Sequence, residues 1–315
     1  MLRLYEDNDF INIYGDITDD AYTNGTRIDY YYRPDGPTHF FTDRRMPKAG
    51  EGSIDIFSWG VAQLMYTPDD LTEPDYQPND YPWSAALFGT HSRFSYNPVK
   101  HYDLQTELVL GVIGPAAMGK EMQSLFHRMT QYYQPAGWGN QFRNDLLANV
   151  NLTAEKQLLS AGSFLTVIGG AQAYAGTMQN GAAVYPLILV GKHAPYFNGF
   201  LSQYTSGGRG RKKWQAYVFA KPEMQLFLSN ALLQGGMFTH NPNLQPDKGE
   251  TKESNHDIEK QQPYHPLQHW LGTFAYGGVL SYGHVGVSLT QTVSAPMLRG
   301  LYCHNYGNIS LYVGW

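Results

Sequence analysis

The last ten residues of the chain, Tyr306–Trp315, read YGNISLYVGW. Apolar side chains at Ile309, Leu311, Val313 and Trp315 alternate here with polar or small ones. A period of two residues is typical of a β-strand that turns one face toward an apolar environment. The terminal aromatic residue favours a transmembrane barrel, with lipid outside and a polar lumen inside. The edge strand of a soluble sandwich also alternates, so that fold stays open as an alternative.

The composition agrees with a β-rich membrane protein. Among 315 residues, 14% are aromatic, 24 are Tyr, and only 16% are charged, against roughly 25% in ordinary soluble domains. The net charge of −5 argues against a nucleic-acid partner. The single cysteine, Cys303, excludes an internal disulfide and a Cys-rich metal site. The chain starts without the regions of a signal peptide and is therefore expected to be a mature form.

Similar alternation predicts eleven further strands, so 1–315 is expected to be one all-β domain, a twelve-stranded antiparallel transmembrane β-barrel. Asn180-Gly181 is expected to form a turn, and the polar insertion 235–263 to be a surface loop. The predicted strands are Leu2–Tyr14, Thr26–Arg33, Ser53–Tyr66, Trp83–Tyr96, Tyr102–Ile113, Asn144–Lys156, Ser163–Ala175, Ala182–Val190, Trp214–Leu233, Leu267–Val279 and Ser281–Val293, before the last at Tyr306–Trp315.

One connection differs from the strand-and-turn pattern. The stretch Leu108–Met129, LVLGVIGPAAMGKEMQSLFHRM, begins as a strand, stops at Gly114-Pro115 and favours helix from Lys120. Gln123 and His127 are four residues apart and would share one helix face. A lone histidine here is more often a surface capping residue, but it can also act as a general base.

A second polar cluster lies near the start of the chain. Glu6–Asp9 supplies four polar residues inside a predicted strand, where Asp and Asn are unusual. The nearby loop residues Tyr22–Gly25 add further oxygen atoms. Such groups can bind a hard cation such as Ca²⁺, although acidic loops are usually only solvated and no EF-hand spacing is present. No Gly-x-Ser-x-Gly elbow supports a serine nucleophile.

Strand counting brings these groups together. If both termini face the periplasm, the connections 15–25 and 114–142 lie on the outer side of the membrane. Asn8 and Asp9 then approach the outer half of the first strand, and Thr23 enters the second strand from outside. One site on the outer face can contain these residues and His127.

In their order along the chain, seven stretches together resemble the outer-membrane lipid A 3′-O-deacylase family. The likeness covers most of the chain and is densest in its first half. The stretches are Glu6–Asp9, Asp20–Gly25, Met65–Pro68, Asn79–Pro82, Gly111–Pro115, Gln123–His127 and Gly137–Gln141.

The resemblance implies a Ca²⁺-dependent ester hydrolase of the Gram-negative outer membrane, which removes the 3′-linked acyloxyacyl chain of lipid A in lipopolysaccharide. It implies a short helix in an outer loop and an active site that faces the outer leaflet. By position, Asn8 and Asp9 resemble the essential polar pair of the family, and Thr23 its essential threonine. Asp9 and Thr23 would hold the metal, while His127 would be the catalytic base with Gln123 beside it. The protein is expected to work as a monomer among outer-membrane lipids.

Two alternatives remain at this stage. The family pattern has a functional lysine between the third and fourth strands, but Thr67–Pro82 contains none, so the substrate can be a different lipid. A non-enzymatic barrel, a porin or scaffold, is the other reading. A narrow lumen crowded with tyrosine, in a protein on which calcium has no effect, would favour it.

Overall fold

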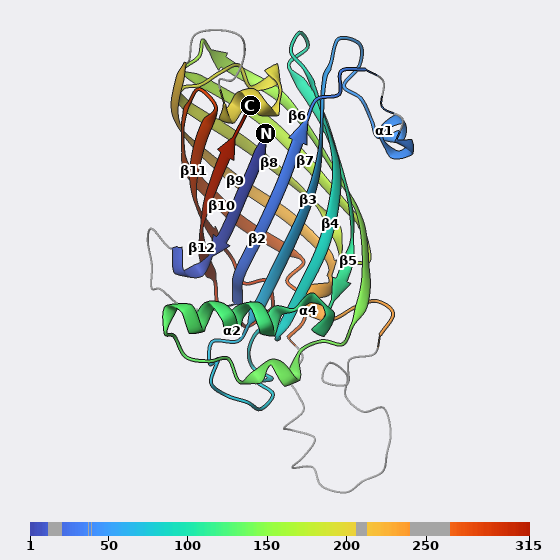
Figure 1. The fold of residues 1–315 in the computed structure, drawn as a ribbon, viewed down its shortest axis with the longest axis vertical. Helices are drawn as coiled ribbons and strands as arrows, with labels where there is room; N and C mark the ends of the chain where they lie inside the picture. Colours follow the sequence, from blue (N-terminus) through green and yellow to red (C-terminus); the bar gives the residue numbers. More distant parts are fainter. Residues whose placement is uncertain (12–20, 37, 39, 206–212, 240–264) are drawn as a thin grey trace, which may run out of the picture.

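Twelve antiparallel strands of the described residues close into a barrel in the computed structural model (Figure 1). The structure describes residues 1–11, 21–36, 38, 40–205, 213–239 and 265–315. Each strand pairs with its neighbours in sequence, and β1 pairs with β12 from Leu2↔Val313 to Asn8↔Gly307. The sheet therefore has no open edge. This closure confirms the predicted barrel and excludes the open sandwich.

The strands follow the predicted order. Their bounds are β1 Leu2–Asn8, β2 Ala21–Tyr32, β3 Ile54–Thr67, β4 Ser84–Asn97, β5 Tyr102–Ile113, β6 Asp145–Ala161, β7 Leu165–Gly176, β8 Gln179–Lys192, β9 Trp214–Asn230, β10 Trp270–Tyr282, β11 Val285–Ser294 and β12 His304–Val313. The helices are α1 Phe41–Arg45, α2 Gly119–Thr130, α3 Phe200–Tyr204 and α4 Ala231–Gln234, with 3₁₀ turns η1 Asp9–Ile11, η2 Pro115–Ala117, η3 Gly137–Asn140 and η4 Tyr196–Asn198.

Two predicted boundaries are wrong near the start of the chain. The first strand ends at Asn8 instead of Tyr14, because the chain turns into η1. The second strand begins at Ala21 instead of Thr26, so residues 21–25, which were assigned to the connection 15–25, belong to the strand. They are extended because β1 and β3 offer partners on both sides.

A third correction concerns the β7–β8 hairpin. Asn180-Gly181 lies inside β8, and the turn consists of Thr177 and Met178. The Asn180 side chain bonds both backbone groups of Gly176, accepting from its N–H at 3.0 Å and donating to its carbonyl at 2.7 Å. Asn180 therefore closes the turn from the strand. Residues 12–14 of the first predicted strand, and 240–263 of the insertion, lie outside the described residues.

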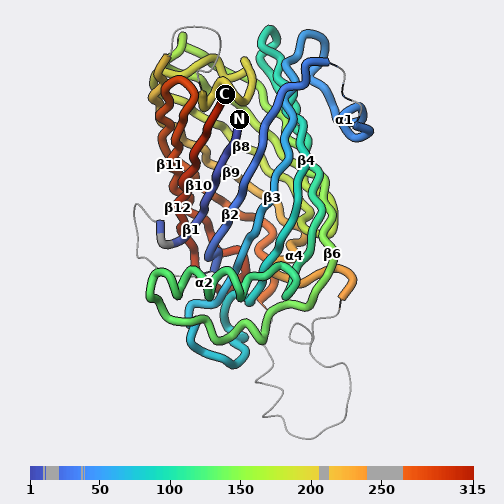
Figure 2. The backbone as a smooth tube through the Cα atoms, in the orientation of Figure 1, coloured from blue at the N-terminus to red at the C-terminus, as the bar shows by residue number. Residues whose placement is uncertain are grey.

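Both termini lie at one end of the barrel together with α1, while α2 and α4 lie at the other (Figures 1 and 2). An even number of strands requires this arrangement, and it agrees with the predicted placing of the connections. We call the end that carries α2 the outer rim. The predicted short helix in an outer loop is confirmed as α2.

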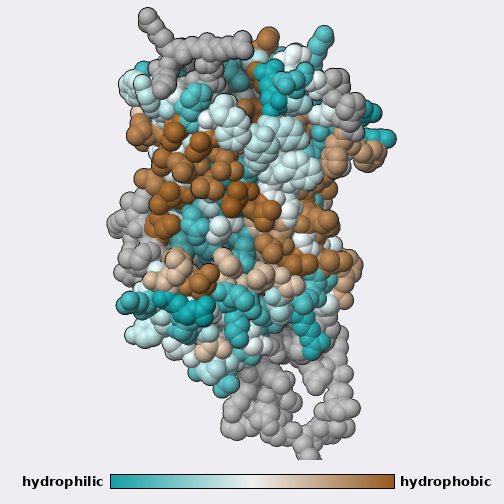
Figure 3. Space-filling model, in the orientation of Figure 1, coloured by the Kyte–Doolittle hydropathy of each residue, from teal (hydrophilic) through white to brown (hydrophobic). Residues whose placement is uncertain are grey.

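The outer surface of the wall is apolar. In β12, Ile309 and Val313 are exposed, while the alternate residues Asn308, Ser310 and Tyr312 are buried. Figure 3 shows a broad hydrophobic belt over the strands, between hydrophilic ends. No helix among the described residues is long and apolar enough to cross a membrane.

The lumen is filled by side chains. At its centre, Arg27 binds Glu107 at 2.6 Å and Asp29 at 2.8 Å, and Arg3 binds Asp29 at 2.6 Å. Near the termini, Tyr204 of α3 stacks on Tyr312 with ring centroids 3.9 Å apart. Glu107 of β5 lies three strands away from Arg27 of β2, and α3, which follows β8, reaches Tyr312 of β12. These contacts therefore tie separate parts of the wall together from inside.

The outer mouth of the lumen is also packed. Leu232 and Leu233 of α4 lie in an apolar cluster with Tyr66 and Leu271, and the Ser84 hydroxyl donates to the Leu232 carbonyl at 2.6 Å. Packing at both ends of the described lumen argues against an open porin channel. The lumen is rich in tyrosine, as expected of a non-enzymatic scaffold. An effect of calcium on the protein is therefore what distinguishes the enzyme from the scaffold.

The lumen network gives the first prediction. Arg27→Met leaves the Glu107 carboxylate without its cation and removes one of two cations from Asp29. Breaking a buried pair by removing one partner costs roughly 3–5 kcal/mol, and we expect the lower end because the Arg27 and Glu107 side chains are 19% and 24% exposed. The unboiled band on a denaturing gel should convert to the unfolded band at a clearly lower temperature. Arg44→Met, on an exposed arginine of α1, is the control; equal conversion temperatures would contradict the role of the network.

Candidate active site

Helix α2 packs against the outer surface of the wall at the rim. Its first residue, Gly119, lies so close to β4 that an added Cβ would be 2.5 Å from the Ala85 Cβ and 2.6 Å from the Trp138 ring. The segment before it is also attached, because the Gln63 side-chain amide of β3 donates to the Ala117 carbonyl at 2.6 Å. The start of the helix is therefore fixed above β3 and β4.

The face of α2 that turns to the barrel is polar. Gln123 and His127 are each 3% exposed and follow Gly119 at intervals of four residues. This confirms the prediction that they share a face. Eight residues of helix rise about 12 Å, which equals two to three strand spacings of about 4.8 Å. Figure 1 shows α2 crossing the strand ends from β4 toward β1, so the second half of the helix, which carries His127, lies on the β2 and β1 side of Gly119.

A backbone contact sets the tautomer of His127. The imidazole Nδ1 is 2.5 Å from the carbonyl oxygen of Tyr133, which can only accept a hydrogen bond. In a neutral ring the proton is therefore on Nδ1, and Nε2 is the basic nitrogen. Gln131 makes this contact possible, since its left-handed conformation (φ 57°) ends the helix and turns the chain back.

Gln123 is held by an aromatic pair. Its Oε1 accepts a hydrogen bond of 2.7 Å from the Trp138 indole N–H, and Trp138 packs on Trp83 with ring centroids 5.0 Å apart. The buried Gln123 Nε2 has no hydrogen-bond partner among the described residues. Leaving a buried donor without a partner costs about 1–3 kcal/mol, so this N–H₂ group is suited to bind a ligand oxygen.

The wall beside α2 carries polar side chains on its lipid-facing surface. β1 and β2 pair Glu6 with Thr26 and Asn8 with Asn24. Glu6 accepts hydrogen bonds from Asn24 and, at 2.7 Å, from Thr26. Figure 3 shows a hydrophilic area in the lower part of the belt, above α2. We call Glu6, Asn8, Asn24 and Thr26 the polar wall patch.

Thr23 and Asp9 lie next to this patch, at places where regular strand pairing is broken. Thr23 interrupts the pairing of β2 with β3, and Asp9 follows the end of β1. The β2–β3 register shifts between Tyr22 and Asn24, so Thr23 is the extra residue of a bulge. Its hydroxyl is 2.6 Å from that of Thr67. Asp9 is buried at the start of η1. This turn fits against β12 because Gly307 has no side chain; a Cβ there would be 1.9 Å from the Ile11 carbonyl oxygen.

The donors near Asp9 suit a hard cation only in part. Asp9 supplies one carboxylate, and Thr23 and Asn8 supply neutral oxygens, which is the donor chemistry that Ca²⁺ prefers. The described residues contain no group of three or more His, Cys, Asp or Glu that could hold a metal ion. A cation here would therefore need oxygen ligands from water or substrate as well.

The predicted site residues thus lie at one end of the barrel. Asn8, Asp9 and Thr23 come from neighbouring parts of β1, η1 and β2, and Gln123 and His127 from the helix across those strand ends. Sequence reasoning grouped Asn24 with the oxygen-rich residues 22–25 but missed its pairing with Asn8, and it missed Thr26 of the polar wall patch and Trp138 behind Gln123. The hairpin register would have revealed Asn24, since a strand starting at Ala21 places it opposite Asn8.

Comparison with known proteins identifies the family. A sequence model of the family described as outer membrane protein LpxR matches residues 1–315. The chain belongs to the LpxR family. The solved structure of LpxR from Salmonella typhimurium has the same fold, with a TM-score of 0.75 over 100% of this chain and 99% of that one, at 18% identity. No curated protein sequence matches the chain.

Membership of the LpxR family confirms the resemblance to the outer-membrane lipid A deacylases. The protein is therefore an integral outer membrane protein, and it belongs to a family of lipid A deacylases. At 18% identity, the structural match supports the barrel and not the individual residues of the LpxR site. The roles of Asn8, Asp9, Thr23, Gln123 and His127 stay predictions, which the experiments below test.

The packing of α2 gives the second prediction. Gly119→Ala puts a methyl group within 2.6 Å of the Ala85 side chain and Trp138 ring, so the helix start must move; such overpacking typically costs about 1–3 kcal/mol. We expect faster proteolysis of the 114–142 connection, while the barrel keeps its unboiled gel position. Gly139→Ala is the matched control, because nothing lies within 4 Å of that Cβ. Equal cleavage rates for both variants would show that α2 is not held at Gly119.

Proposed function

We propose that the protein is a Ca²⁺-dependent carboxylic ester hydrolase that removes the 3′-linked acyloxyacyl chain from lipid A in the outer leaflet. The position of α2 at the outer rim is the observation that supports this proposal. One face buries Gln123 and His127 against the rim that also carries the polar wall patch, and another face is apolar and exposed. An ester at the lipid surface could thus reach a base without entering the lumen.

The exposed face of α2 supports a lipid substrate. Met122, Leu125, Phe126 and Met129 follow the i, i+3, i+4, i+7 pattern of one helix face, and all are exposed. A water-facing helix normally buries such a stripe. Here the polar face is buried instead, so the stripe is suited to contact acyl chains, which in the LpxR family belong to lipid A. Burial of one such side chain contributes about 1.5–3 kcal/mol.

The chemistry assigned to His127 needs one basic nitrogen and a water molecule. Nε2 takes a proton from water as its oxygen attacks the ester carbonyl. The tetrahedral intermediate then breaks the bond to the sugar oxygen, which receives the proton from Nε2. The products are a fatty acid and a free hydroxyl on lipid A. The Tyr133 carbonyl steadies the imidazolium between these steps by accepting from Nδ1–H.

Two amides are suited to bind the negative charge that develops on the carbonyl oxygen. Gln123 offers its unpartnered Nε2 hydrogens, and Asn8 lies on the polar wall patch that α2 faces. Such donors stabilise an oxyanion more than the neutral ester. A Ca²⁺ ion held by Asp9 and Thr23 would add Lewis-acid polarisation of the carbonyl.

The cations that bind the lipid A phosphates must come from outside the β3–β4 connection, which has no lysine. Lys120 and Arg128 are both exposed on α2. They lie near the two ends of α2 and outside the apolar stripe, as expected of basic residues on a helix at a headgroup boundary. They are the candidates to replace the lysine of the family pattern.

The third prediction concerns His127. His127→Gln keeps hydrogen bonding but has no basic nitrogen, so release of acyl chains should fall by about 10²–10⁴-fold, and His127→Ala should be as poor. The measurement is mass spectrometry of lipid A incubated with equal amounts of folded barrel. His284→Gln, on an exposed histidine at the opposite end, is the control. Wild-type turnover by His127→Gln would contradict the mechanism. If the wild-type protein released acyl chains from phospholipid but not from lipid A, the substrate would be a different lipid.

The fourth prediction concerns calcium. Wild-type protein should be stabilised by Ca²⁺ in proportion to the logarithm of its concentration, and should lose activity in excess chelator. Asp9→Asn should lose both responses, because it removes the carboxylate, while the barrel still folds. Asp75→Asn, on an exposed loop of the same rim, should keep both. Full activity of the wild type in chelator would reject the cofactor and leave the rest of the mechanism standing.

A further inference from the structure

The connection between β2 and β3 folds back onto the outer surface of the wall, and its short helix α1 lies near the height of the two chain ends (Figure 1). The Asp43 carboxylate of α1 is buried and lies 2.6 Å from Nε2 of His91 on β4. The Arg93 guanidinium of the same strand donates to the Asp43 and Met46 carbonyls at 3.0 and 2.9 Å. We call residues 40–49 the strap. Its buried side is therefore fixed to β4.

The wall under the strap faces away from the lumen. Trp59 and Val61 of β3 are exposed on the barrel surface, and His91 is the cross-strand partner of Trp59. Arg93 lies two residues further along β4 and shares this face, where its guanidinium also binds Asp55 at 2.8 Å. The strap thus covers charged groups on the membrane-facing surface of the barrel.

A row of aromatic rings relates the strap to the membrane boundary. The row runs from the C-terminus to the strap, and the ring centroids of successive members are between 4.1 and 6.3 Å apart. Its members are Trp315, Tyr30, Tyr32, Phe57, His91, Trp59 and Phe40. Tyr and Trp gather at the headgroup level of membrane proteins, because their rings are partly apolar and partly polar. Helix α1, which directly follows Phe40, therefore lies at headgroup level.

The exposed side of α1 combines an aromatic ring with two cations. Phe41 is 70% exposed, and Arg44 and Arg45 are exposed on the same short helix. The Arg45 guanidinium lies over the Phe41 ring, 5.4 Å from its centroid. In the described part of the chain neither arginine pairs with a carboxylate, and Asp43 is already bound to His91. Two such cations at headgroup level favour a phosphate, which a guanidinium can bind through two parallel hydrogen bonds.

The end of the barrel decides which lipid supplies the phosphate. Helix α1 lies at the end opposite α2 (Figure 1), so in this outer membrane protein it meets the periplasmic leaflet, which consists of phospholipid and not of lipid A. We propose that the exposed side of α1 binds the headgroup phosphate of an anionic phospholipid in that leaflet, with the Phe41 ring beside the start of its acyl chains. A zwitterionic headgroup is less favoured, because its ammonium group is repelled by the two arginines. This binding requires no hydrolase activity.

The test is photo-labelling of the full-length protein in phosphatidylcholine vesicles that contain a small share of a phospholipid with a diazirine near its phosphate. The probe is phosphatidylglycerol in one series and phosphatidylcholine in the other. Peptides of the strap should be labelled several-fold more by the phosphatidylglycerol probe. Arg44→Gln together with Arg45→Gln should abolish this preference, whereas Arg44→Lys with Arg45→Lys, which keeps both charges, should retain most of it. Lys100→Gln with Lys213→Gln is the matched control, because it removes two exposed cations from the same end of the barrel.

The fold of each variant is checked in detergent without phospholipid. There all of them should keep the unboiled gel position of the wild type, because Asp43 and not the exposed arginines holds the strap to the wall. Equal labelling of the strap by the two probes would overturn the proposal. An equal loss of preference in the lysine control would also overturn it, since it would show a general attraction of this end to negative charge. A strap that is unlabelled by both probes, or cross-linked to a second copy of the chain, would exclude a lipid as its partner.

Discussion

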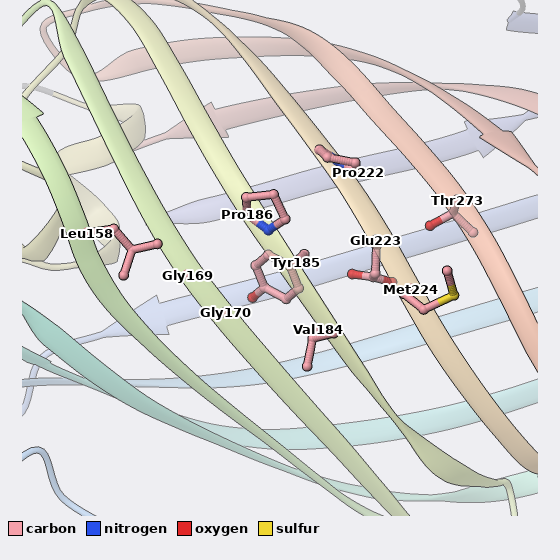
Figure 4. A pocket seen from close by; sticks show the side chains of 10 residues that line it. All are labelled: Leu158, Gly169, Gly170, Val184, Tyr185, Pro186, Pro222, Glu223, Met224 and Thr273. Carbon is pink, nitrogen blue, oxygen red and sulfur yellow. The ribbon is translucent and has the colours of Figure 1, made fainter.

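The structure depends on one constraint, the pairing of backbone groups in hydrocarbon, where each unpaired N–H or C=O costs several kcal/mol. The β1–β12 ladder meets it by closing the ring. Helices and turns are then confined to the rims and the lumen, as α2, α4 and α3 show. The β8–β9 ladder departs from this rule at mid-wall, where Pro186 faces Pro222 (Figure 4) and neither residue has an N–H to donate.

The backbone around the candidate active site follows from the same constraint, because irregular backbone is tolerated only where strand pairing ends. β1 stops at Asn8, η1 begins at Asp9, and the β2 bulge frees Thr23 from the ladder. Gly307 permits this arrangement from the other end of the sequence, since a side chain there would collide with η1. The position of Asp9 is thus fixed by a residue almost three hundred positions away.

The sequence predicts the wall of this protein better than its rim. Alternation depends on nearest neighbours and the two faces of a strand, so β5 and β12 were predicted within two residues. Asn24-Gly25 carries a turn signal, and only the register with β1 shows that it is strand. Short α3 and α4 were not predicted because they are held by lumen contacts such as Tyr204 on Tyr312, which no local pattern encodes.

The helix α2 shows how local and long-range information combine. Its spacing predicts that Gln123 and His127 share a face, but not that this polar face is the buried one. Tertiary anchors reverse the usual orientation: Gly119 against β4, and the Trp138 indole on Gln123. The apolar stripe is left outside, where a membrane and not the protein can cover it. The same anchors therefore orient His127, the proposed base, and leave the apolar stripe exposed, so one set of packing contacts serves both parts of the proposed function.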